Sequence, residues 1–118
     1  MADIGPPPEI RTITEIDAAT GFTRVRCCGR LVASHRDEFY EDVRKLIPGS
    51  KRIVLDFSDV THMDSSGLGA VIRLYASAKS AGCDVQLMNL SKGISRILSV
   101  TNVLSFFTIV GENDIRTL

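Results

Sequence analysis

The sequence lacks several features that would each point to a particular class of protein. Its 14 basic and 14 acidic residues cancel, so it has no basic excess of the kind that nucleic-acid-binding proteins usually carry. No apolar run approaches the roughly 20 residues needed to cross a membrane. The opening "MADIGPPPEI" has neither the basic nor the apolar region of a signal peptide. These absences predict a cytoplasmic protein that neither binds nucleic acid nor inserts into a membrane.

Cysteine and histidine are scarce as well. Cys27, Cys28 and Cys83 make neither a disulfide framework nor a metal-ligand spacing. Cys27 and Cys28 are adjacent in a predicted strand, so their side chains should point to opposite faces. His35 and His62 lie in different segments, and no cluster of histidine, carboxylate and cysteine is evident. We therefore expect reduced thiols, no metal and no cofactor.

What remains is the composition of one soluble globular domain. The chain has 118 residues, of which 44% are hydrophobic and 24% charged, enough to bury a core. "GPPP" at residues 5–8 excludes regular structure there, so residues 1–9 should form a flexible lead-in to a domain spanning 10–118. A strand is expected over 10–16, a turn over 17–21 and a second strand over 22–32, paired as a hairpin.

Helices and strands should then alternate. Ser34 and Asp37 resemble a capping box that starts a helix ending at Pro48-Gly49. "RIVLDF" over 52–57 is apolar at consecutive positions, typical of a strand covered on both faces. The remaining expectations are a helix over 68–81 stopped by Gly82, a strand over 83–90, a helix over 91–100 with Ile94, Ile97 and Leu98 inward, a strand over 106–110, and a turn or helix over 112–118. This order predicts a single α/β domain with a mixed, mostly parallel sheet.

The helix over 68–81 should be broadly buried. Arg73, Ser77 and Ser80 follow one another at helical spacing and make one polar stripe. The apolar positions that cover the rest of the helix are Leu68, Val71, Ile72, Leu74, Tyr75 and Ala78.

The junction before this helix holds more polar and small residues than a helix start needs. Either Asp64 or Ser65 suffices as an N-cap, because each offers an oxygen to the unpaired amides of the first turn. Gly67 and Gly69 each cost roughly 1 kcal/mol against alanine in a helix. Their missing side chains should leave the backbone and hydroxyls open to another molecule. A helix N-terminus also favours an anion, so a phosphorylated hydroxyl would not disrupt its own fold. The junction is therefore a candidate switch.

Catalysis is a poor interpretation of the same residues. A serine-hydrolase elbow requires glycine two positions before the nucleophile, whereas Met63 and Asp64 stand two positions before Ser65 and Ser66. "GLG" lacks the further glycines and lysine of nucleotide-binding loops. We therefore expect no enzymatic activity.

The segments "VLDFSDVTHMDSSGLGAVI" and "AGCDVQLMNLSKGISRILSVTNVLSFFTIV" resemble the STAS domains of bacterial anti-sigma factor antagonists, with "MDSSGLG" as the most recognisable motif. The resemblance spans about residues 22–115. It implies a sheet of four to five strands with three to four packed helices. It also implies phosphorylation of the serine after the motif aspartate, which is Ser65 here, with Asp64, Ser66, Gly67 and Gly69 supporting the site.

The resemblance further implies the partners. The unphosphorylated protein would bind an anti-sigma factor with serine kinase activity and so release the sigma factor. Phosphorylation by that kinase would break the complex, and a serine phosphatase would restore it. We expect partner contacts from Leu68, Arg73 and Ser77 of the following helix.

One stretch departs from the family pattern. The family commonly has Gly-Glu-Leu/Ile-Asp upstream of the site, in a loop that meets the kinase, whereas this chain has "GRLV". Arg30 and Val32 thus replace two carboxylates at a predicted partner-binding position, although Arg30 is also explained as a solvated charge. The departure leaves an alternative open: a non-phosphorylated STAS scaffold or accessory subunit of a stress-sensing or lipid-transport complex.

Overall fold

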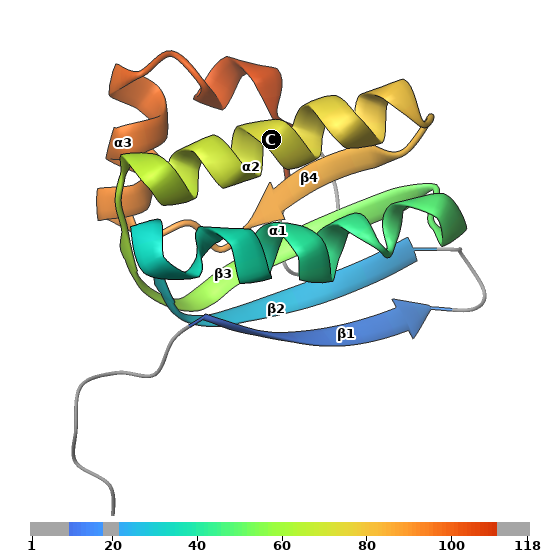
Figure 1. Ribbon diagram of the computed structural model, residues 1–118. Helices are drawn as coiled ribbons and strands as arrows, with labels where there is room; N and C mark the ends of the chain where they lie inside the picture. The colour runs from blue at the N-terminus through green and yellow to red at the C-terminus, as the bar shows by residue number, and fades with distance from the viewer. Residues whose placement is uncertain (1–9, 18–21, 111–118) are drawn as a thin grey trace, which may run out of the picture.

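The computed structural model describes residues 10–17 and 22–110 (Figure 1). The strands are β1 (Arg11–Asp17), β2 (Phe22–Leu31), β3 (Arg52–Met63), β4 (Asp84–Met88) and β5 (Ile109–Val110). The α-helices are α1 (Arg36–Arg44), α2 (Ser65–Ser80) and α3 (Lys92–Val100). Short 3₁₀ turns lie at Ala33–His35, Ile47–Gly49 and Leu104–Phe106. The predicted lead-in, the tip of the hairpin and the terminal segment over 112–118 lie outside the described residues.

The strands form one mixed sheet in the order β1-β2-β3-β4-β5. β1 pairs antiparallel with β2, and every later neighbour is parallel. The predicted hairpin and mostly parallel α/β sheet are therefore confirmed. Figure 1 shows α1 and α2 side by side over the same face of the sheet. Because β2, β3 and β4 run in parallel, their carboxyl ends lie at the same edge of the sheet, and α1, α2 and α3 each begin after one of these ends.

The core lies between the sheet and these helices. Alternate residues of β2 are buried, including Val25 and Leu31, as a strand with one covered face requires. In β3 every residue from Ile53 to Phe57 is buried, as expected for the central strand of the sheet. Cys27 is buried and Cys28 is only half-buried, which confirms that the two thiols point to opposite faces.

Several predicted boundaries were wrong, above all around the candidate switch. β3 continues to Met63, beyond the predicted end of the strand. Its pairing with β2 shifts register between Arg26 and Cys28 and between Gly29 and Arg30. Such irregularities break the alternation from which a strand is recognised. Consequently α2 begins at Ser65, three residues earlier than the expected start at Leu68.

The predicted capping box at Ser34 was also wrong. Ser34 lies inside the 3₁₀ turn Ala33–His35, and α1 begins only at Arg36, with His35 at the N-cap and no side-chain cap. The turn is instead closed by a hydrogen bond from the His35 amide to the Val32 carbonyl at 2.9 Å. The last strand likewise shrinks to Ile109–Val110, because Leu104–Phe106 forms another 3₁₀ turn.

Burial along the helices follows the expectation with some exceptions. Gly82 ends α2 with φ of +77°, the left-handed conformation predicted for a helix stop. Ile72, assigned to the buried part of α2, is 38% exposed. Ser77, assigned to the polar stripe, is half-buried, while Ile97 of α3 is half-buried and packs against the core as predicted. The sheet lies under only part of each helix, so residues at the margin remain partly in solvent.

Candidate functional site

Asp64 organises the corner where β3 meets α2. It is the N-cap of α2 in an extended conformation, and its Oδ1 accepts a hydrogen bond from the Gly67 amide at 2.9 Å. Its Oδ2 accepts another from the Ala33 amide at 3.1 Å. These bonds hold the pKa of Asp64 below its usual range, chiefly through the Gly67 amide and also through Ala33. Asp64 therefore caps the helix as a carboxylate and ties it to the segment that follows β2.

Ser65 is the first residue of α2 and is exposed. Because Asp64 is the cap, the Ser65 hydroxyl is not required for capping. Within the described residues this hydroxyl makes no hydrogen bond. The sequence left the choice of cap open between these two residues, and the structure assigns it to Asp64. An exposed hydroxyl without a structural task thus stands at the positive end of a 16-residue helix.

Ser66 occupies a different environment from its neighbour. It is half-buried, and Nη1 of Arg36 lies 3.5 Å from its hydroxyl oxygen. Arg36 is the first residue of α1 and also contacts Asp37 through Nε at 3.7 Å. Nothing in the sequence marks Arg36 as part of this site. Its contact joins residues 30 positions apart, which only the fold brings together.

Gly67 and Gly69 have different surroundings. A Cβ added to Gly67 would lie 2.0 Å from the carbonyl oxygen of Leu31. The expectation that both glycines open the site to another molecule was therefore wrong for Gly67, because β2 already fills that space. Nothing lies within 4 Å of a Cβ added to Gly69, so at this position the surface of α2 is open.

The residues of "GRLV" lie in β2 and just after it rather than in a loop. Arg30 is half-buried on β2, opposite His62 in the register with β3. Its Nε is buried and has no hydrogen-bond partner among the described residues. Val32 is half-buried and precedes the 3₁₀ turn in an extended conformation. Both positions lie at the same edge of the sheet as the start of α2, and their part in partner binding stays a prediction.

The three partner-binding candidates of α2 already have contacts within the domain. Leu68 is buried in the core at 7% exposure. The Arg73 guanidinium lies 4.1 Å from the centre of the Tyr40 ring, and the Ser77 hydroxyl lies 2.9 Å from the Tyr40 hydroxyl. Arg73 and Ser77 therefore hold α1 against α2. Their contacts with a partner stay predictions, and only Arg73 among the three is exposed.

Sequence reasoning missed a buried aspartate on the sheet. Asp56 is 1% exposed and accepts hydrogen bonds from Arg24 and Asn89 and from the amide of Ser58. Burial opposes its ionisation, but these bonds outweigh burial and lower its pKa. The available signal was an acidic residue inside the apolar run "RIVLDF". Its partners lie on β2 and after β4, so Asp56 joins three segments of the sheet.

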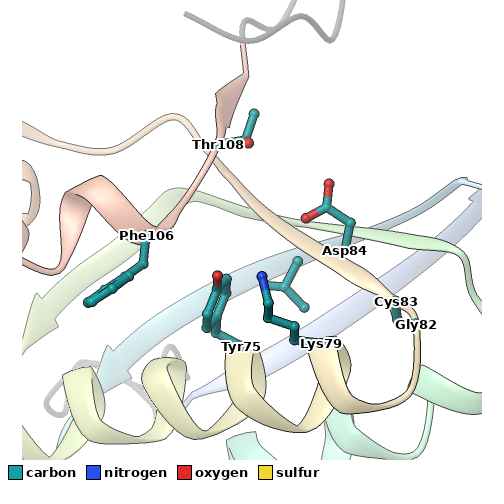
Figure 2. Close-up of a pocket in the computed structure, with 8 residues that line it drawn as sticks. Tyr75, Lys79, Gly82, Cys83, Asp84, Phe106 and Thr108 are labelled. Carbon is teal, nitrogen blue, oxygen red and sulfur yellow. The ribbon is translucent and has the colours of Figure 1, made fainter.

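A hollow of about 400 Å³ lies apart from this corner, toward the end of α2 (Figure 2). Figure 2 shows Tyr75 and Lys79 of α2 on one side and Asp84, Phe106 and Thr108 on the other. Burial raises the pKa of the Cys83 thiol, and the nearby Asp84 carboxylate adds to this effect. Cys83 therefore remains a neutral thiol at physiological pH.

The described residues contain neither a metal-binding cluster nor a membrane-spanning helix. Over residues 10–17 and 22–110, no three histidine, cysteine or acidic side chains gather as a metal would require. Within the same residues no helix is long and apolar enough to cross a membrane.

A sequential mixed sheet with a capped helix and an exposed serine at its start defines a STAS-type domain. The STAS domain family model matches residues 10–114, and the chain belongs to that family. A STAS-domain containing protein of Pseudomonas aeruginosa is 26% identical over 98 residues, covering 82% of this chain and 97% of the relative. The anti-sigma-B factor antagonist of Bacillus subtilis is 27% identical over 73 residues, covering 59% of this chain and 67% of the relative.

The fold is shared with a solved anti-sigma factor antagonist. The unphosphorylated form of SpoIIAA superposes with a TM-score of 0.72 at 17% identity, covering 88% of this chain and 91% of that one. This likeness confirms the α/β fold, which has five strands and three α-helices in the described residues.

Proposed function

We propose that this STAS domain is an anti-sigma factor antagonist switched by phosphorylation of Ser65, and that it has no catalytic activity of its own. The observation that carries the proposal is that Asp64 and Ser65 have separate roles at the start of α2. Asp64 caps the helix and anchors it to the segment that follows β2, which leaves the exposed hydroxyl of Ser65 available to a kinase. The anti-sigma-B factor antagonist of Bacillus subtilis is a relative of this chain, and this supports the same class of partner.

The domain is suited to carry a phosphate at this position. A phosphoserine adds about −1.5 to −2 charge at neutral pH. At the first position of α2, this charge faces the positive end of the helix dipole, which stabilises anions. The modified protein should keep its fold, so a change in binding would arise at the interface.

The same charge would oppose the partner. An anti-sigma factor bound over Ser65 would have to desolvate the phosphate or face it with its own acidic groups, at a cost of about 3 kcal/mol or more. At 1.4 kcal/mol per decade, that cost weakens binding roughly 10²-fold. The partner is an anti-sigma factor with serine kinase activity, and a serine phosphatase removes the phosphate. We propose that Arg30, Val32, Arg73 and Ser77 contribute to this interface, whereas Leu68, also expected there, is buried in the core.

The experiment uses two substitutions that separate charge from fold. The anti-sigma factor is first captured from host cells with unmodified protein and identified by its kinase activity on Ser65. Its affinity is then measured for wild type, Ser65→Ala and Ser65→Asp. Ser65→Ala should bind like the unphosphorylated protein and resist phosphorylation, whereas Ser65→Asp should bind at least 10-fold more weakly.

Ser80→Asp is the matched control, because Ser80 is an exposed serine at the other end of the same helix. It should bind like wild type. Equal affinity of all variants, with no phosphate on Ser65, would reject the switch. In that case a non-phosphorylated scaffold, for which the change to "GRLV" argues, would be the better assignment.

A further inference from the structure

Arg36, the first residue of α1, lies beside the first turn of α2. Its Nη1 lies 3.5 Å from the hydroxyl of Ser66, the residue next to Ser65 in the first turn of α2. A neutral hydroxyl at this distance makes only a weak hydrogen bond. A phosphate offers three strong acceptor oxygens and a double charge, and arginine binds phosphate with two parallel N–H donors.

The fold fixes this segment against α2. The Ala33 amide donates to Asp64 Oδ2 at 3.1 Å, and the Asp64 amide donates to the Leu31 carbonyl at 3.3 Å. Gly67 packs directly on the Leu31 carbonyl. The chain from Leu31 to the start of α1 is thus tied to the first turn of α2. Arg36 follows this anchored segment, so its approach to the serines is set by the fold.

The acidic residues near Arg36 leave its guanidinium available to bind a phosphate. Arg36 is about half exposed, and its contact with Asp37 is a long one through Nε at 3.7 Å. Glu38 contacts His35 at 3.6 Å, and both oxygens of Asp64 already accept backbone amides. A dianion at Ser65 would therefore be the strongest acceptor within reach of Arg36.

We propose that Arg36 is a positioning residue that binds the phosphate of phosphorylated Ser65 within the domain. The proposal rests on the proposed function, since it concerns the same modified serine. The pair would hold the phosphate against the starts of α1 and α2. Phosphorylation would thereby consume a surface cation that the unphosphorylated protein presents beside Ser65.

The test measures the phosphate directly. Phosphoserine is incorporated at position 65 during translation, so neither the kinase nor the anti-sigma factor is needed. The second pKa of the phosphate, about 6 in a free phosphoserine, is followed by phosphorus-31 NMR in the full chain. A nearby cation favours the dianion and lowers this pKa. Arg36→Gln should raise it by about half a pH unit relative to wild type, and Arg36→Lys should restore part of the shift.

Arg44→Gln is the control, because Arg44 is an exposed arginine in the last turn of α1 that pairs with Glu41. It should leave the phosphate pKa unchanged. His35 and His62 are present in every variant, so any effect of theirs on the phosphate cancels. A pKa that is the same in wild type and Arg36→Gln would overturn the inference. The inference would also fail if Arg36→Gln changed the phosphate pKa only when phosphoserine is placed at position 66. Failure of the switch itself would instead appear as an absence of phosphate in host cells.

Discussion

The two glycines at the start of α2 should respond in opposite directions to the same substitution. Alanine is favoured over glycine in a helix by up to about 1 kcal/mol. At Gly69 nothing lies within 4 Å of the added Cβ, so Gly69→Ala should gain about 0.5–1 kcal/mol of stability. At Gly67 the same methyl group would lie 2.0 Å from the Leu31 carbonyl oxygen.

The cost at Gly67 follows from this distance. Ordinary contact begins at 3.4 Å, so raising the separation from 2.0 to 3.4 Å requires a movement of about 1.4 Å between α2 and the end of β2. Overpacking of this kind costs about 1–3 kcal/mol. The movement would also stretch the bonds from Asp64 to Ala33 and Leu31, each worth about 1 kcal/mol. After the helix-propensity gain, Gly67→Ala should lose about 1–3 kcal/mol.

Urea unfolding followed by circular dichroism at 222 nm measures both variants. With a slope of about 1–3 kcal/mol per molar urea, the midpoints of the two variants should lie about 1 M apart. Gly93→Ala is the matched control, since Gly93 lies in the first turn of α3 and nothing lies within 4 Å of its added Cβ. It should behave like Gly69→Ala. If Gly67→Ala is as stable as these two variants, then α2 does not pack on the Leu31 carbonyl as described.

Other consequences concern the acidic residues of the sheet and the site. Asp64→Ala removes the cap of α2 and leaves the Ala33 amide without its acceptor, so the free energy of unfolding should fall by about 1–2 kcal/mol in urea titrations. An unchanged urea midpoint would show that Asp64 does not stabilise both the helix and the segment after β2. The pKa of Asp56 is lowered in the fold, so its contribution to stability is present above the unfolded pKa of about 4 and is lost as pH falls through the folded value. The acid unfolding curve of Asp56→Asn should therefore be flatter than that of wild type, and parallel curves would exclude this source of pH dependence. Ser65→Asp places a carboxylate at the start of α2 and should stabilise the fold by about 0.3–1 kcal/mol, which calorimetry would show as a slightly higher thermal midpoint. A clearly lower midpoint would mean that weakened partner binding reflects misfolding.

The element order was predictable because each element carries its own periodicity. The run from Ile53 to Phe57 is apolar except for Asp56, and it proved to be the buried centre of the sheet. Gly82 ended α2 in the conformation expected of it. What local patterns could not supply was the extension of β3 to Met63, which depends on irregular pairing with β2. The capping box at Ser34 failed for a similar reason, because a 3₁₀ turn precedes α1.

At the site, the sequence identified the junction but not the division of roles within it. The motif marked Asp64, Ser65, Gly67 and Gly69 together. Which residue caps the helix, and which glycine meets another backbone, depended on how closely β2 approaches α2. Arg36 could not be predicted as part of the site, because its contact with Ser66 joins residues 30 positions apart in the sequence. Residue type and spacing carry no information about such a contact until the fold is known.

The most direct test of the central proposal is to map phosphopeptides of this protein recovered from its own host cells, with the co-purified proteins identified in the same sample. The proposal predicts phosphate on Ser65 in part of the population, and an anti-sigma factor with serine kinase activity bound to the unphosphorylated part. An unmodified Ser65 across growth and stress conditions, in a sample that contains scaffold or transporter subunits instead, would contradict it.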